Sequence, residues 1–332
     1  MHLFRWAVLM PVFALGAAAA TPPFTSFDVT GSDFINSDSV GGISNSGMIV
    51  GYYGTASGAL HGFQRLPNGT FVQPIDGPDL LLGFPRDFLT GINNSGTMTA
   101  SGSNPVKAYT VSGGVFTQFL VPGSLNVRLG GINDLGHLAG WFDTGARAGR
   151  PLAFTTAGGT LQFFEYPGSF DTLAYGINNS DQVVGYYDVV GGPGVLSHGF
   201  IRSVAGTFST VDFPGAALTG LNGINDSGIV VGAYSRNSAG FFSDFHCFYG
   251  TPGALTELFI GSGCTGAGGI NNAGQISGTY LDARGITHGF VTQALFLPPT
   301  PAPSSLALLA VALGFVGIVS ALRGILNRPG GL

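Results

Sequence analysis

Four histidines stand at one repeated position of the chain, and imidazole is a side chain well suited to acid–base or metal chemistry. Each of them lies two residues before an aromatic residue: His61, His198, His246 and His288. Equivalent positions of a repeat are spread around a folded array and do not converge on one point. Each histidine also shares strand parity with its aromatic neighbour, which places both between packed layers. We therefore interpret the four as structural, hydrogen-bonded residues and predict no metal, cofactor or catalytic group among them.

Other polar residues offer little more chemistry. Asp143, Asp188 and Asp282 follow predicted strands at equivalent places. They lack the spacing with which one loop wraps a calcium ion, so we interpret them as loop residues that bond their own backbone. Neither a G-x-S-x-G elbow nor an H-E-x-x-H helix is present in the sequence. An enzyme would need a histidine or an acid that breaks the repeat, and His137 and Glu165 are the candidates.

The two cysteines, Cys247 and Cys264, are an even number, which permits a disulfide in an exported protein. Hairpin pairing does not bring them together, because a turn at Gly250–Gly253 pairs Cys247 near Thr256. The sequence leaves this bond open.

A short sequence motif, Gly-Ile-Asn-Asn-Ser-Gly with variants, recurs along the chain, and we refer to it as the repeated phrase. It marks the repeating units whose fold must position the residues named above. Its copies begin at Gly42, Gly91, Gly131, Gly176, Gly223 and Gly269, at steps of 49, 40, 45, 47 and 46 residues. A period near 45 is typical of β-propeller blades. In the phrase, isoleucine fills an apolar strand position, and asparagine and glycine are expected to supply the positive φ angles of a tight hairpin turn.

One repeat shows the strands of a blade most clearly. They are Leu173–Ile177, Gln182–Tyr187, Ser197–Arg202 and Gly206–Phe213, with a glycine-rich loop before the third. Apolar residues occupy both faces of these strands, as a blade packed between two neighbours requires. The aromatic residue of the third strand recurs at Phe63, Tyr109, Phe154, Phe200, Phe248 and Phe290.

The two ends of the repeat region complement each other. No fourth strand follows Phe290, whereas Phe24–Gly31 matches the fourth-strand sequence Phe208–Gly215. An unpaired strand edge is costly, so a chain that carries both halves of a pair should use them. We therefore predict an all-β, six-bladed propeller that is closed by pairing Phe24–Val29 with the strand around His288–Val291.

Composition agrees with an exported globular domain. Apolar residues make up 45% of the 332 residues, enough for a large core, and charged residues only 9%. The formal net charge is −5 and Lys107 is the only lysine, which excludes the basic surface of a nucleic-acid binder.

The sequences at both ends of the chain are typical of targeting segments. Residues 1–20 have a basic start at Arg5, an apolar stretch and small residues up to Ala20, and they predict a signal peptide cut after Ala20. Leu306–Leu322 carries no charge, so we predict a transmembrane helix that leaves residues 323–332 in the cytoplasm.

The C-terminal segment resembles the PEP-CTERM sorting signal of Gram-negative bacteria. The matching residues are Pro301, Pro303, the apolar run and Arg323, and Ala302 stands where that family usually has Glu. The resemblance implies delivery to the cell surface by export machinery, with an exosortase as the processing partner.

The repeats resemble the HAF extracellular repeats of bacteria over residues 40–292. The family's His-Ala-Phe tripeptide stands here as His61-Gly-Phe63, His198-Gly-Phe200 and His288-Gly-Phe290, with His246-Cys-Phe248 as a variant. Little is known of the activity of this family, so the resemblance implies no particular activity for this chain.

The sequence thus predicts five parts: a signal peptide (1–20), a propeller (21–297), a proline-rich sorting motif (298–305), a membrane helix (306–322) and a tail (323–332). We expect a non-enzymatic surface or matrix protein of a biofilm-forming Gram-negative bacterium, associated with exopolysaccharide. The alternative is a secreted propeller enzyme or a lectin-like module that acts on polysaccharide.

Overall fold

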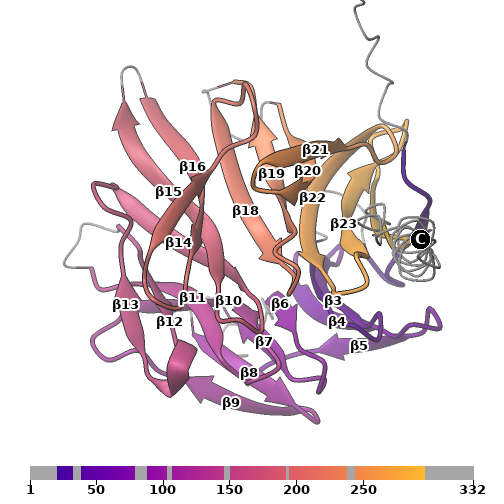
Figure 1. Ribbon diagram of the computed structural model, residues 1–332. Helices are drawn as coiled ribbons and strands as arrows, with labels where there is room; N and C mark the ends of the chain where they lie inside the picture. The colour runs from indigo at the N-terminus through magenta and orange to yellow at the C-terminus, as the bar shows by residue number, and fades with distance from the viewer. Residues whose placement is uncertain are drawn as a thin grey trace, which may run out of the picture. The chain divides into compact units, whose positions relative to one another are not determined.

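Six four-stranded antiparallel sheets make up the described part of the protein, as the computed structural model shows (Figure 1). This confirms the predicted all-β, six-bladed propeller. The structure describes residues 21–32, 39–78, 88–102, 107–145, 150–191, 194–237 and 244–295.

Each blade has four strands in sequential order from the central axis outward. The first strands are β2 (Ser39–Ile43), β6 (Phe88–Ile92), β10 (Asn126–Ile132), β14 (Asp171–Ile177), β18 (Leu218–Ile224) and β22 (Gly263–Ile270). The second strands are β3 (Ile49–Gly54), β7 (Met98–Ser101), β11 (Leu138–Asp143), β15 (Val183–Gly191), β19 (Val230–Ser235) and β23 (Ile276–Leu281). The third strands are β4 (Leu60–Arg65), β8 (Ala108–Ser112), β12 (Leu152–Thr155), β16 (Gly194–Arg202), β20 (His246–Thr251) and β24 (Thr287–Thr292). The fourth strands are β5 (Phe71–Ile75), β9 (Val115–Phe119), β13 (Gln162–Phe164), β17 (Phe208–Val211), β21 (Ala254–Leu258) and, from the start of the chain, β1 (Phe24–Phe27).

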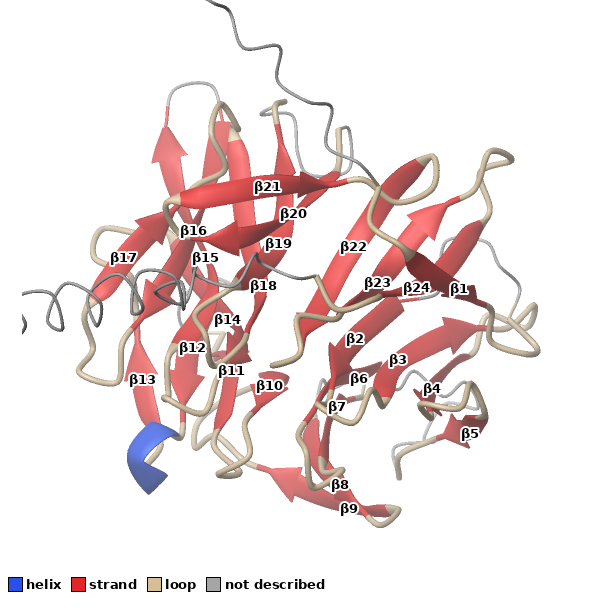
Figure 2. Cartoon of the chain, turned by 45° about the vertical axis from the view of Figure 1, so that its right-hand side comes forward, coloured by secondary structure: helices blue, strands red, loops and turns tan. Residues whose placement is uncertain are grey.

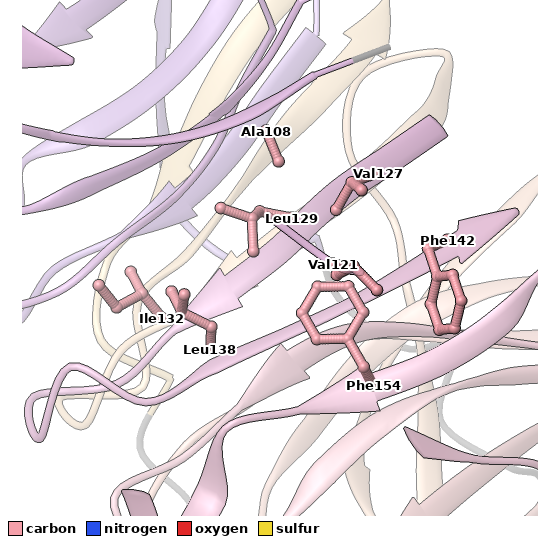
Figure 3. Packing of buried hydrophobic residues seen from close by; sticks show 8 residues of the cluster. All are labelled: Ala108, Val121, Val127, Leu129, Ile132, Leu138, Phe142 and Phe154. Carbon is pink, nitrogen blue, oxygen red and sulfur yellow. The ribbon is translucent and has the colours of Figure 1, made fainter. Parts of the chain in front are cut away.

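The third-strand aromatic residue is the centre of each blade's packing. Phe154 is fully buried and lies directly opposite Gly140 of the second strand, where a methyl group would come within 2.7 Å of the ring. Phe154 belongs to a cluster between the second and third blades that also holds Leu129 and Phe142 (Figure 3). Full burial of such a side chain stabilises the fold by about 1.5–3 kcal/mol.

The first glycine of the repeated phrase allows the six first strands to meet at the axis. A methyl group on Gly42 would lie 2.9 Å from the Cα of Gly91, and one on Gly269 would lie 3.0 Å from the Cα of Gly42. The other neighbouring pairs approach similarly, at 3.1–3.3 Å. Only glycine therefore fits this position of the ring.

The turns between first and second strands differ in part from the expectation. The last residue of the phrase has positive φ, for example 81° at Gly96, and Asp181 takes this role with φ of 58°. The asparagines, however, are not among the described residues with positive φ. Instead, the Asn93 side chain accepts hydrogen bonds from the backbone N–H groups of Ser95 and Thr97. Its amide nitrogen donates to the carbonyl of Asn133 in the next blade.

Closure by the N-terminal strand is confirmed. β1 pairs with β24, with Phe24 opposite Thr292 and Phe27 opposite Gly289. In Figure 2 the two strands lie side by side. Phe27 is buried against the first blade, where it contacts Phe63 and Phe71.

The glycine-rich loop predicted before the third strand of the fourth blade is a strand extension instead. β15 and β16 pair continuously from Val183 opposite Arg202 to Gly191 opposite Gly194.

The predicted signal peptide (1–20), sorting motif (298–305) and membrane helix (306–322) lie outside the described residues. Within the described ranges, no helix is long and apolar enough to cross a membrane.

Candidate ligand-binding site

A β-bulge in every first strand turns one residue toward the propeller axis. The register shifts immediately before the Gly-Ile of each repeat, for instance between Leu129 and Gly131. Bulges re-aim a side chain, and here they point one residue per blade at a shared space. The six bulge residues are Gly41, Thr90, Gly130, Tyr175, Asn222 and Gly268.

These residues form the floor of a cavity of about 510 Å³ on the axis. Its wall comes from the beginnings of first strands and the ends of second strands, so it lies at the end opposite the repeated turns. Its large side chains come from four consecutive blades: Tyr52, Phe88, Arg128, Trp141 and Tyr175. The volume falls within the range of about 300–1,000 Å³ that is typical of ligand sites.

Among the described residues that line the cavity, Arg128 is the only charged one. Its guanidinium carbon lies 5.6 Å from the ring centre of Phe88 and 5.5 Å from that of Trp141. Within the described part of the chain, the guanidinium has no hydrogen-bond or ion-pair partner. Aromatic rings attract the charge without satisfying its N–H groups, so these donors are free for a ligand.

Tyr175 fills the bulge position that is glycine in three blades, and it lines the cavity. Its side chain interacts with Tyr186 and Trp141, and burial raises the pKa of Tyr175 above its ordinary value. The rings of Tyr175 and Tyr186 stack with centres 5.7 Å apart. A methyl group on neighbouring Gly130 would lie 2.6 Å from the Cα of Tyr175, so the site depends on that glycine.

A pair of acids lies behind this tyrosine pair without lining the cavity. Asp171 and Asp188 face each other across β14 and β15. Burial, followed by the charge of Asp188, raises the pKa of Asp171 to about 7. The Ser197 hydroxyl donates to Asp188 at 2.6 Å, while one buried oxygen of Asp171 has no partner. Asp171 therefore keeps its proton to a higher pH than an ordinary aspartate does.

At the turn end of the axis, the second polar residue of each phrase closes a ring of hydrogen bonds. Each backbone N–H donates to the side-chain oxygen of the next blade at 2.6–2.9 Å, and the ring returns from Asn272 to Asn45. Asp134 and Asp226 also accept side-chain amides from both neighbouring blades. These bonds link each blade to the next around the whole ring, so we interpret the ring as structural.

The four repeat histidines lie far out in their blades and not at the cavity. Each imidazole Nδ1 bonds a carboxylate of the fourth strand or of the residue after it. The pairs are His61–Asp76 (2.9 Å), His198–Asp212 (2.8 Å), His246–Glu257 (2.7 Å) and His288–Asp28 (2.6 Å). Each ring also lies 4.9–5.5 Å from a second-strand tyrosine, namely Tyr53, Tyr187, Tyr234 or Tyr280.

The other sequence candidates are scattered. His137 bonds Asp181 at 2.8 Å beside the turn after β10, whereas Glu165 follows β13 at the opposite end of the blade. Among the three aspartates, Asp282 accepts hydrogen bonds from backbone N–H groups of its own loop, as expected. Asp188 departs from that interpretation because it faces Asp171.

Cys247 of β20 and Cys264 of β22 form a disulfide between the fifth and sixth blades. The hairpin register differs by two residues from the expected one, because Cys247 lies opposite Leu258 and Thr256 lies opposite Tyr249. The sorting residues Pro301, Ala302, Pro303 and Arg323 lie outside the described residues.

Sequence reasoning missed the cavity residues altogether. One signal was present: the residue before each Gly-Ile is Gly, Thr, Gly, Tyr, Asn and Gly in the six repeats. A position that varies from glycine to tyrosine directly before an otherwise regular phrase indicates a site that differs from blade to blade.

Neither a family model nor a curated protein matches the chain. Solved propellers resemble it at low identity. An Aleuria aurantia lectin in complex with α-methyl-L-fucoside is 8% identical with a TM-score of 0.44, over 84% of this chain and 97% of that one. The polysaccharide lyase Uly1 is 11% identical with a TM-score of 0.43, over 77% of each chain. An acylaminoacyl peptidase of Pyrococcus horikoshii is 11% identical with a TM-score of 0.42, over 75% of this chain and 44% of that one. Because these proteins differ in activity, the likeness concerns architecture alone.

Proposed function

We propose that this protein is an exported, non-enzymatic propeller that binds carbohydrate at the surface or in the matrix of a biofilm-forming Gram-negative bacterium. The observation that carries the proposal is the axial cavity, in which aromatic side chains surround free hydrogen-bond donors. Sugar rings offer apolar faces and hydroxyl edges, and such a wall matches both.

Binding is favoured over turnover by the chemistry of the cavity wall. Glycoside hydrolysis uses two carboxyl groups on either side of the scissile bond. Among the described residues that line the cavity there is no Asp, Glu or His. The histidine and glutamate proposed for the enzyme alternative, His137 and Glu165, lie at opposite ends of their blade.

The proposed localisation rests on the two ends of the sequence and on the disulfide. A signal peptide cut after Ala20 exports the chain, and Leu306–Leu322 holds it at the membrane until the sorting motif is processed by an exosortase. The Cys247–Cys264 bond fits an oxidising compartment. N-terminal sequencing of exported protein tests the first step, since a start at Met1 would refute export.

A panel of oligosaccharides tests the function. Full-length protein purified in detergent should bind at least one member saturably, and Trp141→Ala should abolish that binding. Phe259→Ala is the matched control, because Phe259 is 43% exposed and does not line the cavity. Absence of binding to every member would refute the proposal, and release of new reducing ends or unsaturated products would favour the enzyme alternative.

A further inference from the structure

We propose that the saccharide bound in the axial cavity is anionic, and that Arg128 binds its acidic group. This inference rests on the carbohydrate-binding function proposed above and narrows its ligand class. It names a specificity residue that breaks the repeat.

The position of Arg128 is specific to one blade. Arg128 lies two residues before the bulge residue Gly130. Counted back in the same way from their own bulges, the other five blades have Ser39, Phe88, Leu173, Gly220 and Gly266 at this position. No other blade therefore places a charge there. A binding site on a repeat scaffold needs such a departure from symmetry in order to hold one ligand in one orientation.

Aromatic neighbours hold the guanidinium in place. Arg128 lies directly opposite Trp141 in the β10–β11 pair, and Phe88 approaches from the preceding blade. Tyr52 packs edge-on against Phe88 with ring centres 4.7 Å apart, which supports that ring in turn. The cation site of this aromatic cluster is thus occupied by the protein's own arginine, so a cationic ligand has no place in it.

Charge and geometry then favour an anion. Among the described residues that line the cavity, Arg128 carries the one charge, in a protein whose net charge is −5. A cation without a counter-charge on the same wall attracts an anionic ligand. The planar fork of an arginine matches a carboxylate in a bidentate arrangement, and its donors here lack any partner among the described residues. Burying such donors against a neutral sugar would leave part of their hydrogen-bonding capacity unused.

The cavity wall also limits what the rest of the ligand is. Tyr52, Trp141 and Tyr175 line the cavity together with the arginine. A free inorganic anion would use none of this surface, whereas an acidic sugar contacts the rings with its pyranose faces and the arginine with its carboxylate. The chemistry named is therefore a uronate or another sugar carrying an anionic group.

Calorimetric titration with matched pairs tests the inference. The probes are oligosaccharides of galacturonate and galactose, and of glucuronate and glucose, together with inorganic phosphate. We expect the acidic member of a pair to bind about 10- to 100-fold more tightly than its neutral partner, since a hydrogen bond to a charged group contributes this much. Added salt should reduce the difference.

Three variants test whether Arg128 causes the preference for acidic probes. Arg128→Met keeps the stem and removes the charge, so it should remove the preference for acidic probes and leave neutral binding intact. Arg128→Lys keeps the charge without the fork and should restore only part of the preference. Lys107→Met removes a charge on a residue that does not line the cavity and is the matched control. Unchanged melting temperatures exclude misfolding as the cause.

The outcomes separate the two proposals. If neutral and acidic probes bind equally and Arg128→Met changes neither, the inference is overturned and carbohydrate binding stands. If no saccharide binds, both proposals fall. If phosphate alone displaces the acidic probe at equal concentration, the cavity is a general anion site and the inference is overturned.

Discussion

Replacing Phe27 by alanine tests how strongly the N-terminal strand closes the ring. Phe27 is 9% exposed and lies in the seam between the sixth and first blades. Its ring centre is 6.5 Å from that of Phe63 and 6.0 Å from that of Phe71, and Arg65 lies over the ring at 4.9 Å. Its partner in β24 is Gly289, over which the ring lies so closely that a methyl group would strike it.

The size of the effect follows from this burial. Truncation of a buried phenylalanine to alanine costs about 3–5 kcal/mol. Because Phe27 lies on a four-residue edge strand that can relax, we expect a loss near the lower end, about 3 kcal/mol. For a domain of this size each kcal/mol lowers the melting temperature by roughly 2 °C, so the expected decrease is about 6 °C.

Differential scanning calorimetry measures this decrease. The matched control is Thr25→Ala, because Thr25 is an exposed residue of the same strand and its loss should cost no more than about 0.5 kcal/mol. Gly289→Ala should also destabilise the fold, because the added methyl group would press on the ring of Phe27 from β24. If Phe27→Ala and Thr25→Ala both have the melting temperature of the wild type, β1 does not hold the ring closed. A Thr25→Cys, Val291→Cys pair that fails to crosslink would refute the register as well.

Three further predictions concern other parts of the propeller. Reduction of Cys247–Cys264, which closes a 17-residue loop, should lower stability by about 3 kcal/mol in chemical denaturation, and reductant should leave a double serine variant unaffected. Asp171 has a folded pKa of about 7 against an ordinary 3.8, so its protonation stabilises the fold at low pH and this contribution is lost as pH rises through 7. The wild type should therefore lose more stability between pH 5 and pH 8 than Asp171→Asn, and equal losses would contradict this. Gly130→Ala should lower the melting temperature by several degrees, since its methyl group would press on the backbone of Tyr175, and an unchanged value would refute that packing.

Features that recur in every repeat could be predicted from the sequence. Phe290 and its counterparts mark the third strands because each blade buries the same ring between the same neighbours. The closing strand could be predicted too, since its sequence matches a fourth strand that the last repeat lacks. The turn asparagines were misassigned because their bonds to the next blade depend on the closed ring, which a single repeat does not reveal.

The candidate site could not be predicted for the same physical reason. Phe88, Arg128 and Tyr175 are some 40 residues apart in sequence and meet only because the first strands of three successive blades converge on the axis. The cysteine pair is similar, because Cys264 belongs to the first strand of the next blade and not to a hairpin partner of Cys247. Such contacts depend on how neighbouring blades pack against each other, and the sequence of a single blade does not predict that packing.

The place of β24 between β1 and β23 has a mechanical consequence. The chain leaves the propeller at the end of β24, where Gln293 still bonds the carbonyl of Pro23. A pull along β24 by whatever holds the following segment would load its hydrogen bonds to both neighbours at the same time, in shear. A pull that separated the two ends of the propeller would instead peel β1 from β24 one bond at a time. The domain is therefore built to resist tension applied through its C-terminal end alone, and to open readily when both ends are drawn apart.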